Sequence, residues 1–420
     1  MSTHLAGYQP FPFPKDLFAK FIKENDGYFP IRLQALPEGT VANAHTPVYQ
    51  ITAEGEYSRL VTFFETLLTQ VWYPTTVATL SRRARERIEG GFERSSAAGR
   101  ADPGVDFGLH DFGFRGCCTV EQAMLGGSAH LLNFRGTDTM AAAYYVQMEL
   151  NGGKPVGTSV PASEHSVMTA WPTELEAIER MVDEFGAGTY SVVMDSYDYS
   201  RALHELLPVV KEKKLGKGGV LVIRPDSGDP VWCVVEGLKA LEKTFGAEEN
   251  ARGYKVVNKA RVIQGDGINI TTLGEILDAV LAAGFSAENV VFGMGAGLLQ
   301  KVNRDTMSFA TKLCYIVNAD GREMNVMKRP TTDSGKTSLP GVLEVKRVGG
   351  VPTVFPEGAG PAGEEDLLRT VYDKGPVPGA WEGTFDALRD KVQREWEACP
   401  PKYDPLSDEL KLKVAQVLGK

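Results

Sequence analysis

The feature that most constrains the fold of this chain is a set of four short polar or glycine-rich motifs, each directly after an apolar run. The motifs are Asp195-Ser196-Tyr197-Asp198, Arg224-Pro225-Asp226-Ser227-Gly228, Gln264-Gly265-Asp266-Gly267 and Gly293-Met294-Gly295-Ala296-Gly297. The runs before them span residues 190–194, 219–223, 260–263 and 289–292, and their β-rich composition predicts strands. Residues 273–283 have helical periodicity, so the last two strands flank a helix. In a parallel α/β protein, the polar ends of such strands are where ligands bind.

Composition narrows the class of protein. The 420 residues fit one barrel of ordinary size plus a further domain. A net charge of -9 argues against a nucleic-acid partner, and no apolar stretch is long enough for a membrane span. The N-terminal residues 1–15 lack the apolar centre of a signal peptide. Five cysteines without metal-ligand spacing are expected to be reduced, which favours a cytoplasmic protein.

Further elements follow from periodicity and turn residues. Helices are predicted at residues 18–25, 57–87, 136–148, 175–185, 201–213, 231–245 and 407–417. Strands are predicted at residues 130–134, 312–318 and 323–328, the last two forming an antiparallel pair around Asp320-Gly321. Thr137 or Asp138 is expected to cap the helix that begins near residue 136, and residues 333–340 are expected to form a mobile loop.

Two glycine segments suggest a phosphate site. Gly265-Asp266-Gly267 and Gly295-Ala296-Gly297 can each turn successive backbone N–H groups toward one point and bind a phosphate oxygen. Each alone is as readily a tight turn. Their position after neighbouring predicted strands favours the phosphate interpretation.

Charged and aromatic residues near the motifs suggest the rest of a ligand site. Arg224 and Asp226 are two residues apart and therefore face the same side of an extended strand end, where a structural ion pair is the alternative. Phe112 and Arg115 offer a stacking face and a guanidinium, although a core phenylalanine and a surface arginine explain them equally well. His165 follows a carboxylate in a polar loop and is a candidate reactive imidazole, with a structural histidine as the alternative.

Positive charge follows the last glycine segment. Lys301, Arg304, Lys312 and Lys328 supply the kind of cations that a pyrophosphate needs, with scattered surface lysines as the alternative. A sugar hydrolase with paired carboxylates is a different class of function, but the glycine segments and this basic cluster argue against it.

Seven motifs occur in an order that resembles a known family. They are HDFGFRG (110–116), NFRGTDT (133–139), VPASEHS (160–166), MDSYD (194–198), IRPDSGDP (223–230), IQGDGI (263–268) and GLLQKVNRD (297–305). Together they resemble the nicotinamide phosphoribosyltransferases of the type II nicotinate/nicotinamide phosphoribosyltransferase family, over roughly residues 26–328.

This resemblance implies an α/β fold: an irregular α/β barrel with a second, β-containing domain. We expect an N-terminal α+β region at residues 1–105, the barrel with the active site at 106–318, and a C-terminal β/α region at 319–420. The resemblance also implies a cytoplasmic homodimer and a pentosyl transfer, in which nicotinamide and phosphoribosyl pyrophosphate give nicotinamide mononucleotide and pyrophosphate in NAD salvage. Mg²⁺ accompanies the pyrophosphate, and ATP is hydrolysed through a phosphohistidine.

The resemblance also assigns residue roles. It gives catalytic roles to His165 as the phosphorylated histidine, to Asp226 beside the ribose and nicotinamide, and to Asp195 near the ribose. It places Phe112 against the nicotinamide ring, Arg115 near ring and phosphates, and Asp138 at the amide NH₂. The remaining substrate-binding residues are Arg224 on the ribose and phosphate side, Gly265, Asp266, Gly295 and Ala296 at the 5′-phosphate, and Arg304, Lys312 and Lys328 at the pyrophosphate.

The chain departs from the family pattern in three places. Ala296 and Ala310 stand where the family has glycine and serine. The family's opening Asp-Ser-Tyr-Lys segment, whose tyrosine covers the second face of nicotinamide across the dimer, is missing. A truncated chain, a misplaced gene start and another element filling the site are the alternatives, and we expect the segment to be encoded upstream in frame. Nicotinate phosphoribosyltransferase and a non-catalytic nucleotide-binding homologue therefore stay open as alternative functions.

Overall fold

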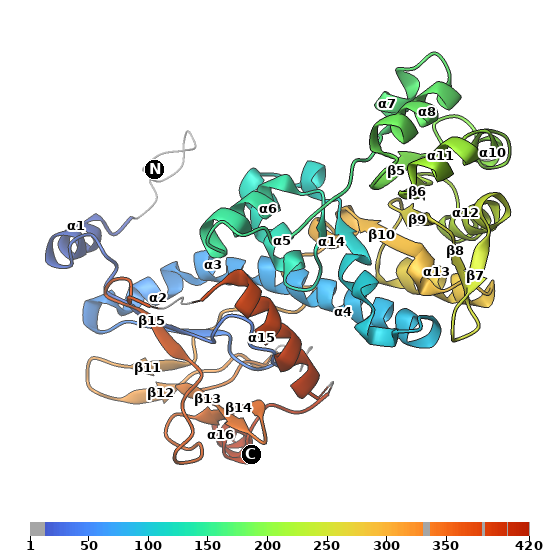
Figure 1. The fold of residues 1–420 in the computed structure, drawn as a ribbon. Helices are drawn as coiled ribbons and strands as arrows, with labels where there is room; N and C mark the ends of the chain where they lie inside the picture. Colours follow the sequence, from blue (N-terminus) through green and yellow to red (C-terminus); the bar gives the residue numbers. More distant parts are fainter. Residues whose placement is uncertain (1–12, 331–336, 380–382, 401, 420) are drawn as a thin grey trace. The chain divides into compact units, whose positions relative to one another are not determined.

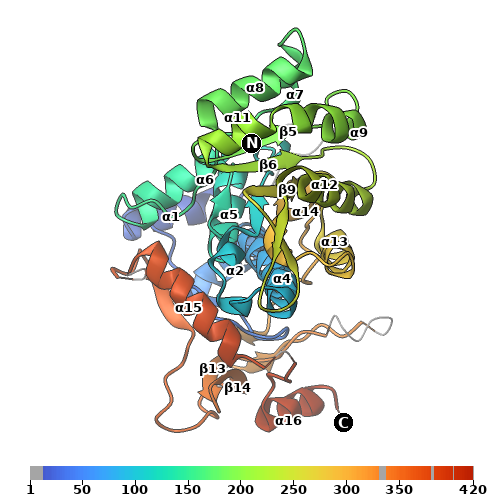
Figure 2. The same cartoon turned by 45° about the vertical axis from the view of Figure 1, so that its right-hand side comes forward.

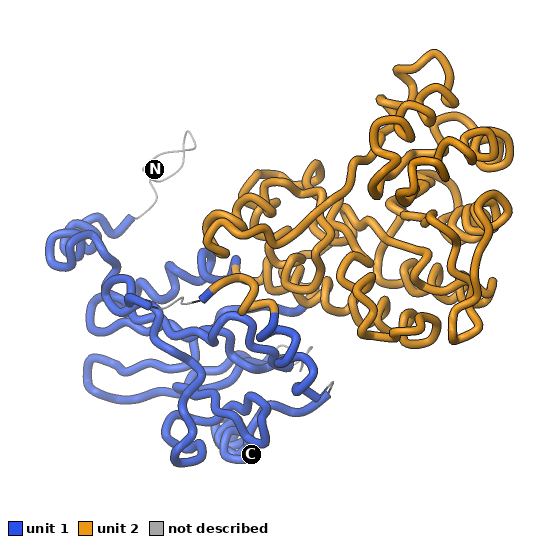
Figure 3. Tube along the Cα trace, viewed as in Figure 1, with its two compact units in different colours: residues 1–70, 307–383, 390–420 blue, residues 71–306, 384–389 orange. Residues whose placement is uncertain are grey.

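The computed structural model describes residues 13–330, 337–379, 383–400 and 402–419. The chain divides into two compact units (Figure 3): unit 1 comprises residues 1–70, 307–383 and 390–420, and unit 2 comprises residues 71–306 and 384–389. Residues 333–336 of the loop predicted at 333–340 lie outside the described residues.

Unit 2 is built on a six-stranded sheet in which all neighbouring strands run parallel, in the order β4-β3-β10-β9-β6-β5 (Figures 1 and 2). Its strands are β3 (Leu109–Asp111), β4 (Gly136–Thr137), β5 (Thr189–Val193), β6 (Val220–Arg224), β9 (Ala260–Gln264) and β10 (Val290–Met294). The last four are buried over most of their length, as expected for parallel strands covered on both faces. This parallel half-barrel confirms the predicted α/β fold class and the four strands predicted before the polar motifs.

Helices cover the sheet of unit 2 (Figure 2). They include α4 (Trp72–Ser95), α5 (Val120–Leu131), α6 (Met140–Tyr145), α7 (His165–Thr169), α8 (Glu174–Phe185), α9 (Tyr199–Arg201), α10 (Leu207–Val209), α11 (Lys211–Lys217), α12 (Pro230–Phe245), α13 (Ile270–Ala282) and α14 (Ala296–Leu299). Several begin at a side-chain cap: Asp229 accepts from the Trp232 amide before α12, and Asn269 forms a capping box with Thr272 before α13. The caps explain why these helices start at the polar ends of the strands. A short antiparallel hairpin, β7 (Ala247–Glu249) with β8 (Lys255–Val257), completes the unit.

Helix α4 belongs to the core of unit 2. Its buried side chains Val77, Ala84, Ile88 and Phe92 join one hydrophobic cluster with residues of all the longer strands. The units therefore divide at residues 70/71 and 306/307, whereas the sequence-based boundaries were placed at 105/106 and 318/319. The boundary differs from the prediction because α4 packs on α5 and α13 of unit 2. The glycine- and charge-rich segment that follows α4 in the sequence does not indicate this packing.

The strand predicted at residues 130–134 is wrong. Helix α5 continues through residue 131, and the strand β4 follows only at Gly136. Close packing holds this helix: a Cβ on Gly126 would lie 2.5 Å from the Tyr73 hydroxyl. The buried His130 ring is bonded on both sides, with Ser81 Oγ 2.9 Å from Nδ1 and the Gly136 carbonyl 3.0 Å from Nε2. Tertiary contacts thus override the β-like composition of this segment.

The described residues of unit 1 form three small antiparallel sheets. They are β15 (Arg369–Asp373), β1 (Arg32–Ala35) and β2 (Tyr49–Thr52); β11 (Tyr315–Val317) and β12 (Glu323–Asn325); and β13 (Leu343–Val348) and β14 (Val351–Pro356). Its helices include α1 (Lys15–Glu24), α2 (Leu60–Phe63), α3 (Glu65–Leu68) and α16 (Asp408–Val417), while α15 (Phe385–Ala398) begins in unit 2 and ends in unit 1. The antiparallel pair β11–β12 and the terminal helix, capped by Ser407, confirm the predictions for those segments.

A lysine lies buried in unit 2 without a carboxylate partner. Lys214 of α11 is fully buried; its ammonium donates to the carbonyl of Lys259 at 2.5 Å and lies 4.8 Å from the centre of the Phe245 ring. Burial, with the nearby charges of Lys259 and Arg261, lowers the pKa of Lys214 to about 8. Below that pH the folded state must bury a charged ammonium, and this cost is relieved as pH rises from about 8 toward the ordinary value.

We therefore predict that Lys214→Met stabilises unit 2 at pH 7, by roughly 1–2 kcal/mol after allowance for the lost hydrogen bond. The gain should shrink as pH rises from about 8 to about 10.5, the range in which the folded lysine has lost its proton and the unfolded lysine still binds one. Thermal denaturation of both proteins at pH 7 and pH 10.5 measures it.

Lys217→Met is the matched control, because this lysine of the same helix is exposed and also donates to a backbone carbonyl, that of Asp183, at 3.0 Å. A destabilised Lys214→Met protein at pH 7, or an equal shift at both pH values, would contradict the prediction.

Candidate active site

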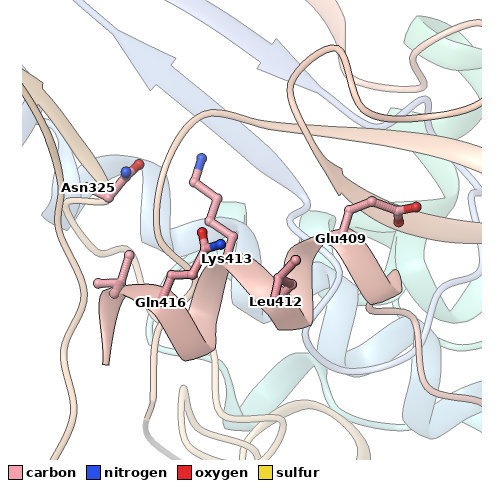
Figure 4. A pocket seen from close by; sticks show the side chains of 6 residues that line it. Asn325, Glu409, Leu412, Lys413 and Gln416 are labelled. Carbon is pink, nitrogen blue, oxygen red and sulfur yellow. The ribbon is translucent and has the colours of Figure 1, made fainter. Parts of the chain in front are cut away.

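The carboxyl ends of the six parallel strands place the polar motifs along one edge of the sheet. Residue pairs across the ladder, such as Asp111 with Thr137, Met294 with Asp111, and Val193 with Arg224, align the strand ends. The segments that follow each strand therefore emerge side by side. A hollow in unit 1 contains none of the candidate residues; it is lined by Asn325, Glu409, Leu412, Lys413, Gln416 and Val417 (Figure 4).

A histidine and two carboxylates meet after β5 and β6. His165 Nε2 lies 3.2 Å from Asp195 Oδ1, and His165 Nδ1 lies 3.8 Å from Asp226 Oδ2. The Asp195 side chain is only 3% exposed, and its other oxygen accepts from the Asp226 amide at 2.9 Å and from the Ser227 hydroxyl. The imidazole is 46% exposed at the start of α7. Asp195 thus holds the turn after β6 in place and orients an imidazole that solvent or a ligand can reach.

Arg224 and Asp226 face the same side of the strand end, as their spacing predicted. Arg224 Nη2 lies 3.9 Å from Asp226 Oδ2, and both side chains are largely buried. Arg224 Nε has no hydrogen-bond partner among the described residues. Because this nitrogen is buried, an anionic or hydroxyl-bearing ligand would be bound through the terminal Nη groups of the 15% exposed side chain.

The Phe112 ring is seated on two glycines. A Cβ built on Gly293 would lie 2.1 Å from Phe112 Cε2, and one on Gly265 would lie 2.9 Å from the same atom. The Phe112 amide also donates to the carbonyl of Met294 at 3.1 Å. Glycine at the ends of β9 and β10 therefore lets the ring lie directly over the backbone, beside the turn that carries Asp226.

Asp138 does not cap a helix. Thr139 occupies the N-cap position of α6, and no side chain bonds there, so the predicted cap at Thr137 or Asp138 is wrong. The Asp138 carboxylate instead accepts from the Ser159 hydroxyl and lies 3.9 Å from His110 Nδ1. Burial acts to raise the pKa of Asp138, but the His110 ring and the Ser159 hydroxyl outweigh it and leave that pKa below its ordinary value. Asp138 is therefore a carboxylate at neutral pH.

Asp111 supports the turn between these groups. One oxygen of its buried carboxyl accepts from the Gly113 amide at 2.7 Å, while its backbone carbonyl accepts from the Asp138 amide at 3.0 Å. Burial raises the pKa of Asp111 to about 6, against the opposing effect of the Gly113 bond. Asp111, His110, Ser159 and Ser227 were missed as site residues from the sequence. The only sequence feature that could have indicated these four residues is that each lies in, or directly beside, one of the seven family motifs.

The two glycine turns lie next to each other because β9 and β10 are neighbours in the sheet. Gly267 adopts a φ of +69°, which suits the tight turn after Asp266. Ala296 is the first residue of α14 and does not have a positive φ, so replacing a glycine there costs no backbone strain. The alanine keeps the backbone N–H that a glycine would supply.

The predicted cations are divided between the two units. Arg115 is exposed in a short turn, and its side chain has no ion pair with any described residue. Arg304 Nη2 lies 2.7 Å from Asp305 Oδ1. Lys312 and Lys328 belong to unit 1, where Lys312 Nζ lies 2.9 Å from Glu65 Oε1.

The described residues contain no cluster of three or more histidine, cysteine, aspartate or glutamate side chains that would hold a metal ion. All five cysteines are free thiols. Within the described ranges, no helix has both the length and the apolar character needed to cross a membrane.

Comparisons with known proteins identify the family of the chain. The model of the nicotinate phosphoribosyltransferase (NAPRTase) family matches residues 107–375. A nicotinamide phosphoribosyltransferase of Xanthomonas campestris pv. campestris is 41% identical over 390 residues, covering 90% of this chain and 82% of that protein. One of Acinetobacter baylyi is 32% identical over 399 residues, covering 89% and 78%. The crystal structure of human nicotinic acid phosphoribosyltransferase shares the fold, with a TM-score of 0.51 at 16% identity over 96% of this chain and 86% of that one. The chain belongs to the nicotinate phosphoribosyltransferase family.

Proposed function

We propose that this protein is a nicotinamide phosphoribosyltransferase, which joins nicotinamide to the ribose of phosphoribosyl pyrophosphate and releases pyrophosphate. The observation that carries the proposal is the carboxylate of Asp138 at the strand edge that also holds Phe112 and the two glycine turns. The names of the relatives at 41% and 32% identity support the same base and the same reaction.

The reaction forms a bond from the pyridine nitrogen to the ribose C1 while the bond from C1 to pyrophosphate breaks. Positive charge develops on the ribose, and the carboxylates of Asp195 and Asp226 stabilise it. Arg224 and Arg304 of unit 2 neutralise phosphate charge. The glycine turns around Gly265 and Gly295 bind the 5′-phosphate through backbone N–H groups. Holding the two reactants in line removes up to about 7–11 kcal/mol of entropic barrier in favourable cases.

Asp138 explains the choice of base. Its carboxylate accepts a hydrogen bond from the amide NH₂ of nicotinamide but repels the carboxylate of nicotinate. The seated Phe112 ring stacks on the pyridine and Arg115 lies toward ring and phosphates, which keeps the amide within reach of Asp138.

The first test is the reaction itself. Purified protein with phosphoribosyl pyrophosphate, Mg²⁺ and nicotinamide should form nicotinamide mononucleotide, and nicotinate should react far less well, as chromatography of the products measures. Asp138→Asn removes the charge at constant size and should reduce the preference for nicotinamide by on the order of tenfold.

Two results would replace the proposal. A wild-type preference for nicotinate would identify a nicotinate phosphoribosyltransferase. Binding of nicotinamide mononucleotide by calorimetry, without turnover of either base, would identify a non-catalytic homologue.

We further propose that Mg²⁺ enters with the pyrophosphate group of the substrate and that ATP phosphorylates His165. An imidazole nitrogen forms a bond to the γ-phosphorus while the bond to ADP breaks, and water later releases phosphate. The exposed ring, oriented by Asp195 and near Asp226, supports this role.

Labelling tests this step. Protein incubated with ATP labelled in its γ-phosphoryl group should carry a label that is stable to base and lost in acid. His165→Ala should lose this label and the stimulation by ATP while keeping measurable phosphoribosyl transfer. His204→Gln, at an exposed histidine 3.4 Å from Glu236, is the control. A label that persists in His165→Ala would contradict the assignment.

We also propose that the protein is a cytoplasmic homodimer. Three apolar side chains, Met140, Tyr144 and Met148, are 75%, 66% and 48% exposed at four-residue spacing on α6 and the turn after it. Such a stripe next to Asp138 suits a second copy of the chain. The free thiols support a reducing compartment.

Sedimentation velocity should therefore give twice the chain mass of 45.7 kDa. Tyr144→Glu should shift the protein toward the monomer, whereas Val209→Glu, at a 60% exposed residue of α10, should not. A monomeric wild-type protein at micromolar concentration would exclude the dimer.

A further inference from the structure

His110 is the central residue of β3, and its ring is closely packed against the neighbouring groups. Its side chain is buried, and a Cβ on Gly136 of the neighbouring strand β4 would lie 2.5 Å from His110 Cδ2. The ring centre lies 6.4 Å from that of Phe112, edge to face. His110 Nδ1 lies 3.9 Å from Asp138 Oδ1. At this separation the interaction is electrostatic rather than a hydrogen bond, and its size depends on whether the imidazole carries a proton.

The charged groups around His110 come from each element packed against it. Asp138 follows β4, and His130 lies on α5, bonded to the carbonyl of Gly136. Asp111 is the next residue of β3, so its side chain points to the opposite face of the strand. On β10 the residue opposite His110 is the uncharged Gly293. Arg224 acts on the Asp138 carboxylate from β6.

Among these neighbours, Asp138 is the carboxylate that interacts with the charge on His110. Buried His130 stays neutral, because burial lowers its pKa to about 4. A protonated His110 therefore pairs with Asp138 and cancels most of its field, whereas a neutral His110 leaves the negative charge directed at a ligand.

We propose that His110 is a specificity-determining residue, whose charge decides how strongly Asp138 rejects a negatively charged substituent on the pyridine ring. A neutral His110 maintains selection for an amide over an acid. A protonated His110 relaxes that selection. The inference rests on the proposed function, in which Asp138 faces the substituent, but it concerns the ratio between two bases and not the presence of activity.

The experiment measures the ratio of kcat/KM for nicotinamide to kcat/KM for nicotinate between pH 6 and pH 8.5. The wild-type ratio should fall by about tenfold toward the acidic end. His110→Gln and His110→Phe cannot gain a proton, so their ratios should not change between pH 7 and pH 8.5, a range that lies above the Asp111 pKa of about 6. Melting temperatures near that of the wild type show that a variant is folded.

Two further variants separate charge from structure. Ser159→Ala removes the hydroxyl that bonds to Asp138 and should alter the ratio by the same factor at every pH, with the wild-type pH dependence retained. His204→Gln removes a surface histidine and should leave the profile unchanged.

A wild-type ratio that is constant with pH, or a His110→Gln ratio that still falls, would overturn the inference. Dissociation constants of both bases, measured by calorimetry over the same pH range, test it where turnover is absent. Failure of the proposed function is separate, because it requires that the wild-type protein forms no mononucleotide from nicotinamide at pH 8.

Discussion

The hydrogen-bond ladder between the six parallel strands is the constraint on which the site depends. It brings residues from β3, β4, β5, β6, β9 and β10, spread over nearly 200 positions of the chain, to one edge. Because the strands are buried, their register is set by the core and not by the loops. The segments at Phe112, Asp138, Asp195, Asp226 and Gly265 inherit their positions from that register.

At this edge of the sheet, single residues hold more than one neighbouring group in place. Asp195 bonds to the turn that carries Asp226 and to His165, while the Phe112 ring rests on Gly265 and on Gly293 of β10. A change at one strand end therefore moves a neighbouring group as well, and the effects of paired substitutions are not expected to add.

The sequence predicted most of this because strand ends are marked by abrupt changes in residue type. The four polar motifs and the Arg224–Asp226 orientation needed only local periodicity. Features decided by tertiary packing could not be predicted. Residues 130–134 resemble a strand but complete a helix packed against Tyr73, and Asp138 resembles an N-cap but turns toward Ser159. The long-range partners His110 and Ser159 have no local signature.

The balance of charge at the site determines which charged groups of the substrates it favours and which it opposes. In unit 2 the carboxylates of Asp138, Asp195 and Asp226 gather near a single closely held cation, Arg224. Such a field favours a cationic ribose and a neutral base, but it opposes the approach of a polyanionic sugar diphosphate. Binding therefore requires positive charge that these residues do not supply. On the proposal that Mg²⁺ enters with the pyrophosphate, the ion would supply this charge. Once pyrophosphate departs, the carboxylates face the positive charge on the ribose, where their field is most favourable.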